Sequence, residues 1–347
     1  MQKITTLTQS AQNIIKDCFL KWKNKFPNKI VALPHSGSNR QYFRIFEENN
    51  TIIGVYNNNS KENRAFLSFT EHFGSFKINV PTILRTFIEK NVYFINDLGN
   101  TNVLDWLNRN RKNNNFSDNA LELYKNIITQ LIKIQIDAGK TIDYSLSYPD
   151  SDFNRESILF DLNYFKNEFL RKTNIDFNEV TLEKDFNFFA DYLLQTNCSY
   201  FMYRDFQARN IMLYNSYPYF IDYQGGRKGA LQYDLASLLY QAKANIPEHT
   251  RTHLLNYYID NVKKTIDIDK IGFKKHYYAY ALIRVLQTLG AYGYRGLFEK
   301  KQHFIDSIPY AINNLSNLKN KITFSENIPE LSNIIDILIS NKFDYEQ

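Results

Sequence analysis

Two short stretches decide how this chain of 347 residues folds: 203–210 (YRDFQARN) and 221–224 (IDYQ). An apolar strand is expected before the first stretch, and another directly after Asn210. The segment 211–221 is predicted to form a hairpin that turns through 215–218 and returns the chain, so that Asp222 lies beside Asn210. A carboxylate and an amide supply the oxygen ligands that Mg²⁺ prefers. A surface turn rich in Asp and Asn is the competing interpretation, but the strands on both sides favour a built site.

The spacing within these stretches is that of a kinase catalytic loop. In kinases an aspartate accepts or orients the acceptor hydroxyl, and an asparagine five residues later binds Mg²⁺. A second aspartate, on the far strand of a hairpin, bridges the metal to the β- and γ-phosphates. Asp205, Asn210 and Asp222 match these three positions. They predict a phosphotransferase that uses ATP and Mg²⁺.

Most of the chain resembles the aminoglycoside phosphotransferase and choline kinase superfamily. Within it, the stretches 204–210, 221–229 and 233–239 look like the anomeric sugar kinases of cell-wall recycling, which phosphorylate N-acetylmuramate or N-acetylglucosamine at the 1-position. The stretches 37–45 and 284–290 are also similar to that branch. The resemblance implies Asp205 as the catalytic base and an α+β, bilobal, protein-kinase-like fold.

The same resemblance assigns other parts of the site. It implies that the adenine edge meets backbone groups in a linker between lobes, formed by Asp97, Leu98 and Gly99. Asp234 matches a family aspartate near the active-site loops, and we expect it to orient Arg204 or the catalytic loop. The residues that we consider as acceptor contacts are Gln224, Arg227, Asp234, Arg284 and Tyr292. For Arg284 and Tyr292 a place in the core is the alternative, and for 225–229 a basic surface loop.

The nucleotide side departs from the common kinase pattern. The strand 51–56 contains no lysine where many kinases place the one that contacts the α- and β-phosphates. We therefore expect Arg40 or Arg44, from the first hairpin, to supply the phosphate cation. Glu62 is either the helix carboxylate of this lobe or an exposed residue that stabilises a helix start. The tight turn that could approach phosphate, or be an ordinary hairpin turn, contains Ser36, Gly37 and Ser38.

The catalytic loop has a further departure and a further cation. Tyr203 stands where the family usually has histidine, a position that commonly supports the loop. Arg209, inside the loop, either neutralises charge in the transition state or pairs with a carboxylate. We list Asp205 and Arg209 as the catalytic candidates, with Asn210 and Asp222 as the metal ligands.

The predicted elements change in character along the chain. Residues 1–96 read as one helix followed by strands and a second helix, and we expect a nucleotide-binding lobe there. Residues 97–347 carry long amphipathic helices with one β-rich interruption, and we expect a helical lobe with the catalytic loop and the acceptor site. The pattern therefore predicts a small β-rich N-terminal lobe and a larger, mostly helical C-terminal one.

Composition excludes several other classes of protein. Hydrophobic residues make up 44% of the chain, which is enough for a core, and the net charge of +6 does not indicate a nucleic-acid partner. The two cysteines lack the spacing of a disulfide framework or zinc motif, which suits the cytoplasm. The N-terminus lacks the apolar region of a signal peptide, and no stretch is long and apolar enough to span a membrane.

Taken together, the sequence predicts an ATP-dependent kinase whose acceptor is most simply the anomeric hydroxyl of an N-acetylated amino sugar. An aminoglycoside or choline-type kinase is the alternative of the same class. A pseudokinase that only binds nucleotide or sugar is the alternative of another class, supported by Tyr203 and by the lysine-free strand. The pattern gives neither the choice between ATP and GTP nor the oligomeric state.

Overall fold

The computed structural model describes residues 2–34, 40–48, 50–111, 116–340 and 343–344. Within this part the chain forms two compact units that do not follow the order of the sequence. The first unit comprises residues 1–103, 142–149 and 210–226, and the second comprises 104–141, 150–209 and 227–347. The chain thus passes from the second unit to the first between Arg209 and Asn210. The predicted boundary between residues 96 and 97 stays a prediction.

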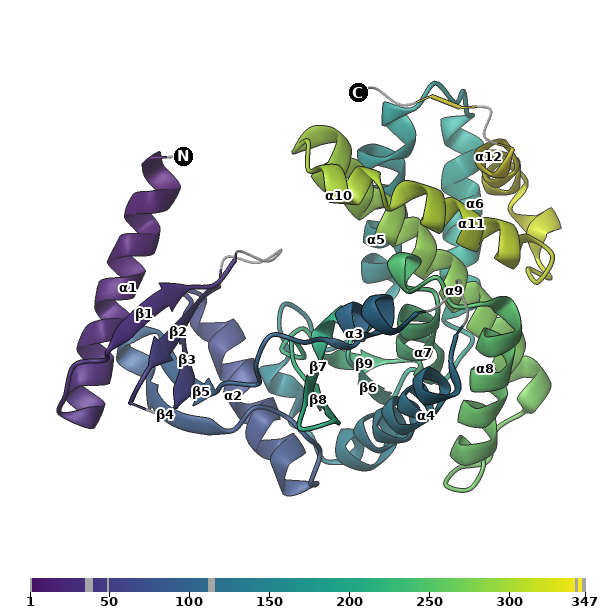
Figure 1. Ribbon diagram of the computed structural model, residues 1–347. Coiled ribbons are helices and arrows are strands. Elements are labelled where there is room, and N and C mark those ends of the chain that lie inside the picture. The colour runs from purple at the N-terminus through teal and green to yellow at the C-terminus, as the bar shows by residue number, and fades with distance from the viewer. Residues whose placement is uncertain (1, 35–39, 49, 112–115, 341–342, 345–347) are drawn as a thin grey trace. The chain divides into compact units, whose positions relative to one another are not determined.

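The first unit contains a five-stranded antiparallel sheet of order β1-β2-β3-β5-β4 (Figure 1). Two long helices accompany it, and a separate two-stranded ladder pairs β7 with β8. The bounds of these elements are α1 (Gln2–Lys23), β1 (Lys29–Ala32), β2 (Gln41–Phe46), β3 (Thr51–Tyr56), α2 (Ser60–Ser75), β4 (Ile83–Phe87), β5 (Val92–Asn96), β7 (Ile211–Tyr214) and β8 (Tyr217–Phe220).

The two helices of this unit contact side chains that point to opposite faces of the sheet. Phe94 on β5 packs edge-on against Phe19 of α1, in the core between this helix and the sheet. The preceding residue, Tyr93, stacks on Phe66 of α2 with ring centroids 5.0 Å apart. Successive side chains of a strand alternate between faces, so α1 and α2 cover different sides. Gly54 permits the close approach of α1, because a Cβ there would lie 3.0 Å from a methyl of Ile15.

The second unit is built almost entirely from helices. Its central helix, α9 (Lys270–Tyr292), contacts α5, α7 and α11, while α4 packs against α8. A short antiparallel ladder pairs β6 with β9. The other elements are α3 (Val103–Asn110), which begins at the unit boundary, α4 (Asp118–Ile132), α5 (Arg155–Glu168), α6 (Glu179–Leu193), β6 (Tyr200–Met202), β9 (Arg227–Gly229), α7 (Leu231–Leu239), α8 (Glu248–Val262), α10 (Gln302–Ile305), α11 (Ile308–Lys319) and α12 (Pro329–Ile339).

These elements confirm the predicted α+β class, with a sheet in the N-terminal part and a mostly helical remainder. The expected turn at 215–218 is wrong in its extent. The turn consists of Asn215 and Ser216, both with positive φ (49° and 67°), which is the two-residue type that matches the twist of a hairpin. Pro218 lies inside β8, opposite Leu213. In the described residues, no helix is both long and apolar enough to cross a membrane.

Candidate active site

The hairpin β7–β8 brings the two candidate metal ligands together in the first unit. Ile211 pairs with Phe220, and the next residue outward, Ile221, donates its backbone N–H to the carbonyl of Asn210 at 3.1 Å. This pairing leaves Asn210 and Asp222 at the open end of the ladder. The Asn210 amide lies 3.3 Å from Asp222 Oδ2. The structure thus places Asp222 beside Asn210, as the hairpin predicts.

The other carboxylate oxygen of Asp222, Oδ1, accepts hydrogen bonds from a cation and from an amide. Arg40 Nη2 donates to Asp222 Oδ1 at 2.6 Å, and Gln224 Nε2 donates to the same atom at 2.9 Å. The side chain of Asp222 is 36% exposed, so it is accessible to a ligand. One amide and one carboxylate fit Mg²⁺, which usually completes its octahedron with waters and substrate phosphates. The side chain of Gln224 is buried and supports Asp222, and its contact with the acceptor stays a prediction.

Tyr223 fixes the backbone next to Asp222. Its ring stacks on Phe66 of α2 at 5.4 Å with an interplanar angle of 2°, and it packs edge-on against Phe73 at 5.3 Å. Its hydroxyl lies 2.5 Å from Thr70 Oγ1. Asp222 itself has φ +72°, a left-handed conformation that aspartate tolerates better than most residues. The sequence predicted a second helix in this lobe but not that Tyr223 packs on it.

Arg40 lies where its guanidinium can take the place of the lysine that the strand β3 lacks. It comes directly before β2, whose first residue pairs with Tyr56 at the end of β3. Besides Asp222 it faces Glu62 in the first turn of α2, with Nε 3.5 Å from Oε1. Arg40 is only 4% exposed. In other kinases a strand lysine pairs with a helix glutamate, and here Arg40 lies between Glu62 and Asp222, the candidate metal ligand. Of the two interpretations of Glu62, this contact favours the helix carboxylate of the lobe.

Arg44, the other expected phosphate cation, has a different partner. Its guanidinium binds Asp97 through Nε at 2.5 Å and Nη2 at 2.9 Å, and it reaches the carbonyl of Gly99 at 3.1 Å. A bidentate pair of this kind fixes geometry as well as charge. Arg44 therefore ties β2 to the segment that follows β5, and of the two arginines expected to bind phosphate this pairing favours Arg40.

The same contacts describe the predicted linker. Asp97 is engaged by Arg44 and accepts the backbone N–H of Gly99 at 2.9 Å, and Gly99 has φ +79°, which favours glycine. Burial opposes the charge of Asp97, but hydrogen bonds from Arg44, Thr51 and Gly99 lower its pKa. Leu98 is buried. Contact of this segment with adenine stays a prediction. Ser36, Gly37 and Ser38 lie outside the described residues.

We expect Arg40→Ala to raise the KM for ATP by about 10- to 100-fold, since it removes a charged contact beside the metal aspartate. Arg44→Ala should instead lower the thermal stability, because Asp97 loses its bidentate partner, and leave the KM for ATP close to its original value. Steady-state kinetics and thermal unfolding of both variants check this. If neither variant changes the KM for ATP, the assignment of the phosphate cation to these arginines is wrong.

In the second unit, Asp234 holds the start of the catalytic loop. Its carboxylate accepts the backbone N–H groups of Tyr203 at 2.7 Å and Arg204 at 3.0 Å, and the side-chain amide of Gln135 at 3.2 Å. Asp234 has no exposed surface, and burial raises its pKa to about 7. The expected role of orienting the loop fits these contacts. The acceptor contact that we also considered for Asp234 stays a prediction, and the enclosed oxygens do not support it.

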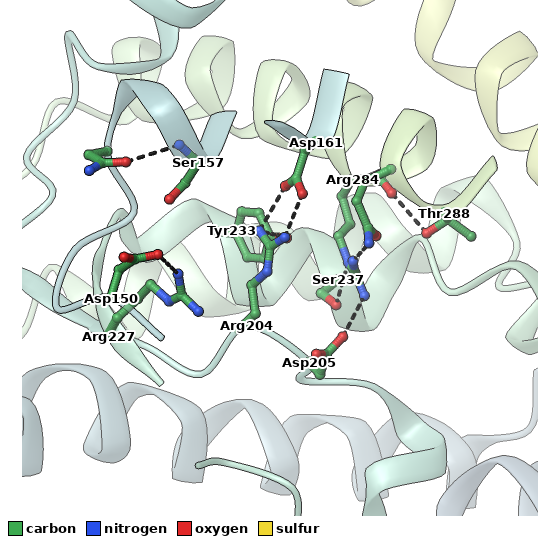
Figure 2. A network of polar contacts seen from close by, with 12 residues as sticks. Asp150, Ser157, Asp161, Arg204, Asp205, Arg227, Tyr233, Ser237, Arg284 and Thr288 are labelled. Carbon is green, nitrogen blue, oxygen red and sulfur yellow. Dashed lines mark hydrogen bonds and ion pairs between the residues drawn. The ribbon is translucent and has the colours of Figure 1, made fainter. Parts of the chain in front are cut away.

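The Arg204 guanidinium binds a carboxylate that the sequence did not single out. Asp161 on α5 accepts from Nη1 at 2.8 Å and Nη2 at 2.6 Å, and the hydroxyl of Tyr233 accepts at 2.7 Å (Figure 2). Arg204 also lies over the rings of Phe153 and Tyr233, 5.0 and 5.3 Å from their centroids. The loop backbone and the guanidinium are thus held by two different aspartates.

Asp205 points away from this anchor toward Arg284 of α9 (Figure 2). Arg284 Nη2 donates to Asp205 Oδ1 at 3.1 Å, and Nε donates to Ser237 Oγ at 3.0 Å. The Asp205 side chain is 43% exposed, whereas that of Arg284 is 5% exposed. Burial opposes the charge of Asp205, but Arg284, Arg204 and Arg209 hold its pKa below the usual value. Asp205 is therefore accessible, and the neighbouring arginines favour the ionised form that a general base requires.

Three other predicted site residues, Arg284, Tyr292 and Arg209, lie near Asp205 or interact with it or its neighbours. The guanidinium of Arg284 is buried against Asp205, Ser237 and Gln287, so it positions Asp205, and its contact with the acceptor stays a prediction. Tyr292, at the end of α9, is half-buried and interacts electrostatically with Arg209 and Arg284. Arg209 is exposed in the short turn before Asn210 and also acts on Asp205. The catalytic role of Arg209 and the acceptor role of Tyr292 stay predictions.

The fold is that of small-molecule phosphotransferases. The crystal structure of choline kinase LicA from Streptococcus pneumoniae superimposes with a TM-score of 0.55 at 11% identity, covering 89% of this chain and 99% of that one. An ADP-bound aminoglycoside phosphotransferase, APH(2'')-Ib, gives a TM-score of 0.56 at 14% identity, over 89% and 98% of the two chains. No model of a known protein family matches the sequence.

Relatives detected by sequence carry one name. The N-acetylmuramate/N-acetylglucosamine kinase of Pseudomonas putida is 26% identical over 72% of this chain and 70% of its own. The protein of that name from Neisseria meningitidis is 27% identical over 58% of each chain. The resemblance to the aminoglycoside phosphotransferase and choline kinase superfamily, with the amino-sugar kinases as a similar branch, is confirmed. So is the predicted class of enzyme, a phosphotransferase with a hydroxyl acceptor.

Proposed function

We propose that this protein transfers the γ-phosphoryl group of ATP to the anomeric hydroxyl of an N-acetylated amino sugar, with Mg²⁺ as cofactor. The proposal rests mainly on the contacts among Asn210, Asp222 and Arg40, which bring an amide, a carboxylate and a cation within hydrogen-bond distance. This is the chemistry that a metal-bound triphosphate requires. The relatives' name supports the choice of acceptor. The cytoplasmic location stays a prediction.

Each of the residues described above has one proposed task. Asn210 and Asp222 hold the metal, and Arg40 binds phosphate oxygens, which are anionic and attract a guanidinium. Magnesium, when bound, neutralises charge on the phosphates. Asp205 accepts the proton of the acceptor hydroxyl. Arg284 keeps Asp205 ionised and oriented, and Asp234 fixes the loop that carries it.

The pseudokinase alternative loses part of its support in this structure. It rested on the strand without lysine and on Tyr203. Arg40 supplies a cation next to Asp222 and Glu62. Tyr203 is buried and packs edge-on against Phe206 with ring centroids 5.1 Å apart, as a residue that supports the loop does. Neither feature therefore argues against turnover.

A screen of ADP release tests the function. The purified chain with ATP and Mg²⁺ is offered N-acetylmuramate, N-acetylglucosamine, other amino sugars, an aminoglycoside and choline. We expect turnover with an N-acetylated amino sugar and none when Mg²⁺ is chelated. Turnover with choline or an aminoglycoside alone would replace the proposed acceptor. Magnesium-dependent nucleotide binding without turnover of any acceptor would favour the pseudokinase.

A further inference from the structure

The guanidinium of Arg284 uses all three of its nitrogen atoms for contacts within the second unit. Nη2 donates to Asp205 Oδ1 at 3.1 Å, and Nε donates to Ser237 Oγ at 3.0 Å (Figure 2). Nη1 donates to Oε1 of Gln287, one turn further along α9. A guanidinium is planar and its N–H groups have a fixed geometry. Arg284 therefore holds the side chain of Gln287 at a fixed position relative to Asp205.

The contact with Arg284 decides which way the amide of Gln287 faces. A guanidinium nitrogen can only donate, so the amide oxygen must face it and the amide nitrogen is directed elsewhere. Gln287 is half-buried. Among the described residues its Nε2 neither has a hydrogen-bond acceptor nor is enclosed. Gln287 therefore presents a donor of hydrogen bonds that a ligand can reach.

This donor lies close to the proposed base. Two hydrogen bonds and one guanidinium connect the amide of Gln287 with Asp205, so Nε2 is at most about 10 Å from the carboxylate. The anomeric hydroxyl of the acceptor must come within hydrogen-bond distance of Asp205. In a 2-amino sugar the nitrogen is bound to the neighbouring ring carbon. The group on that nitrogen can therefore reach Gln287 while the hydroxyl contacts the base.

The polarity of this position distinguishes an acetylated nitrogen from an unmodified one. An acetamido group offers a carbonyl oxygen, which can accept from Nε2. An unmodified amine is protonated below about pH 7, so it offers donors alone and carries the same charge as Arg284. It would leave Nε2 without an acceptor, which costs free energy in a partly buried place. Asp205 attracts an ammonium group, but the three arginines around it offset that charge.

We propose that Gln287 donates a hydrogen bond to the acetamido carbonyl of the acceptor and so selects an N-acetylated amino sugar over one with an unmodified amine. The inference rests on the proposed function and names a residue that sets this part of the specificity. Sequence similarity drew attention to the stretch 284–290 but assigned no role to Gln287. Arg227 of β9, which is buried with Nη1 3.5 Å from Asp150, stays a predicted acceptor contact, and the inference does not depend on it.

The test compares N-acetylglucosamine with glucosamine, below about pH 7 so that the amine is protonated. In Gln287→Glu we expect the ratio of kcat/KM for the acetylated sugar to that for glucosamine to fall by about 10- to 100-fold. The carboxylate can still accept from Arg284, but it repels a carbonyl oxygen and attracts an ammonium group. Gln287→Met, which keeps the length of the side chain without its donor, should give a smaller fall.

Gln195→Glu is the matched control. It makes the same change at an exposed residue in the turn after α6, in the same unit, and should leave the ratio unchanged. If both sugars lose the same factor in the Gln287 variants, Gln287 only positions Arg284 and the inference is overturned. An unchanged ratio in Gln287→Glu overturns it as well.

Failure of the proposed function gives a different result. In that case the unsubstituted protein turns over no amino sugar, and equilibrium binding of the two sugars decides the inference. Tighter binding of N-acetylglucosamine that is lost in Gln287→Glu supports the contact with Gln287. Equal binding of the two sugars, or binding of neither, contradicts it.

Discussion

Asp205→Asn is expected to lower kcat by about 10³-fold, within the range that a positioned acid or base contributes. The amide cannot accept the proton of the acceptor hydroxyl, while its size is that of the carboxylate it replaces. The fold should persist, because Asp205 is 43% exposed and the loop is anchored by Asp234. Initial rates of ADP release at saturating sugar measure the effect. Nucleotide binding, measured separately, should be retained.

Asp191→Asn is the matched control for this variant. Asp191 is an exposed carboxylate of the same unit that pairs with Arg155, and its loss should leave kcat unchanged. The pH profile gives a second readout. Asp205 is active when ionised, and its pKa lies below the usual value for aspartate. Activity should therefore persist as the pH falls and be lost only below the range where an ordinary aspartate titrates. Near wild-type turnover of Asp205→Asn would exclude Asp205 as the base.

Short-range relations in the site could be predicted from sequence. Asn210 and Asp222 are joined by a hairpin whose pairing follows from two apolar runs and a turn. The register of that pairing places the two residues side by side at the end of the hairpin. The turn itself was misplaced because Pro218 reads as a turn residue. The structure places it in β8, a strand that pairs with β7 alone within its ladder, and proline is tolerated at such edges.

Partners far apart in the chain could not be predicted. Arg40 and Asp222 are 182 residues apart, and Arg204 and Asp161 are 43 apart. Sequence indicated that a cation must replace the lysine, but Arg40 and Arg44 were equal candidates. Packing decides between them: Arg40, at the start of β2, reaches Asp222, and Arg44, further along the same strand, reaches Asp97. Such choices depend on which helices and strands pack against each other. Residue types and their spacing within a short stretch of sequence do not determine that packing.

The anchors of the catalytic loop illustrate the same limit. The sequence left open whether Asp234 orients the Arg204 guanidinium or the catalytic loop. Asp234 accepts backbone N–H groups of the loop, and Asp161 from α5 binds the guanidinium. Both bonding patterns satisfy the same buried groups. Only the position of α5 distinguishes them.

Asp222→Asn is expected to lower kcat/KM for ATP by at least about 10³-fold, since it removes the only carboxylate among the proposed metal ligands and a charge that metal and phosphates need. It should also remove the effect of Mg²⁺ on nucleotide affinity, which titration calorimetry with and without the metal measures. The fold should survive, because Tyr223 remains packed on α2.

The matched control is Asp17→Asn, which changes an exposed carboxylate on α1 of the same unit. The variants of Asp205 and Asp222 should then differ in which property they lose, turnover alone or turnover together with magnesium-dependent nucleotide binding. Asp205→Asn should keep magnesium-dependent nucleotide binding and lose turnover, because it removes the base. Asp222→Asn should lose both, because turnover needs the metal-bound nucleotide that it can no longer hold. If Asp222→Asn kept magnesium-dependent binding, the metal would be held elsewhere, and the contact of Arg40 with Asp222 would be a structural ion pair.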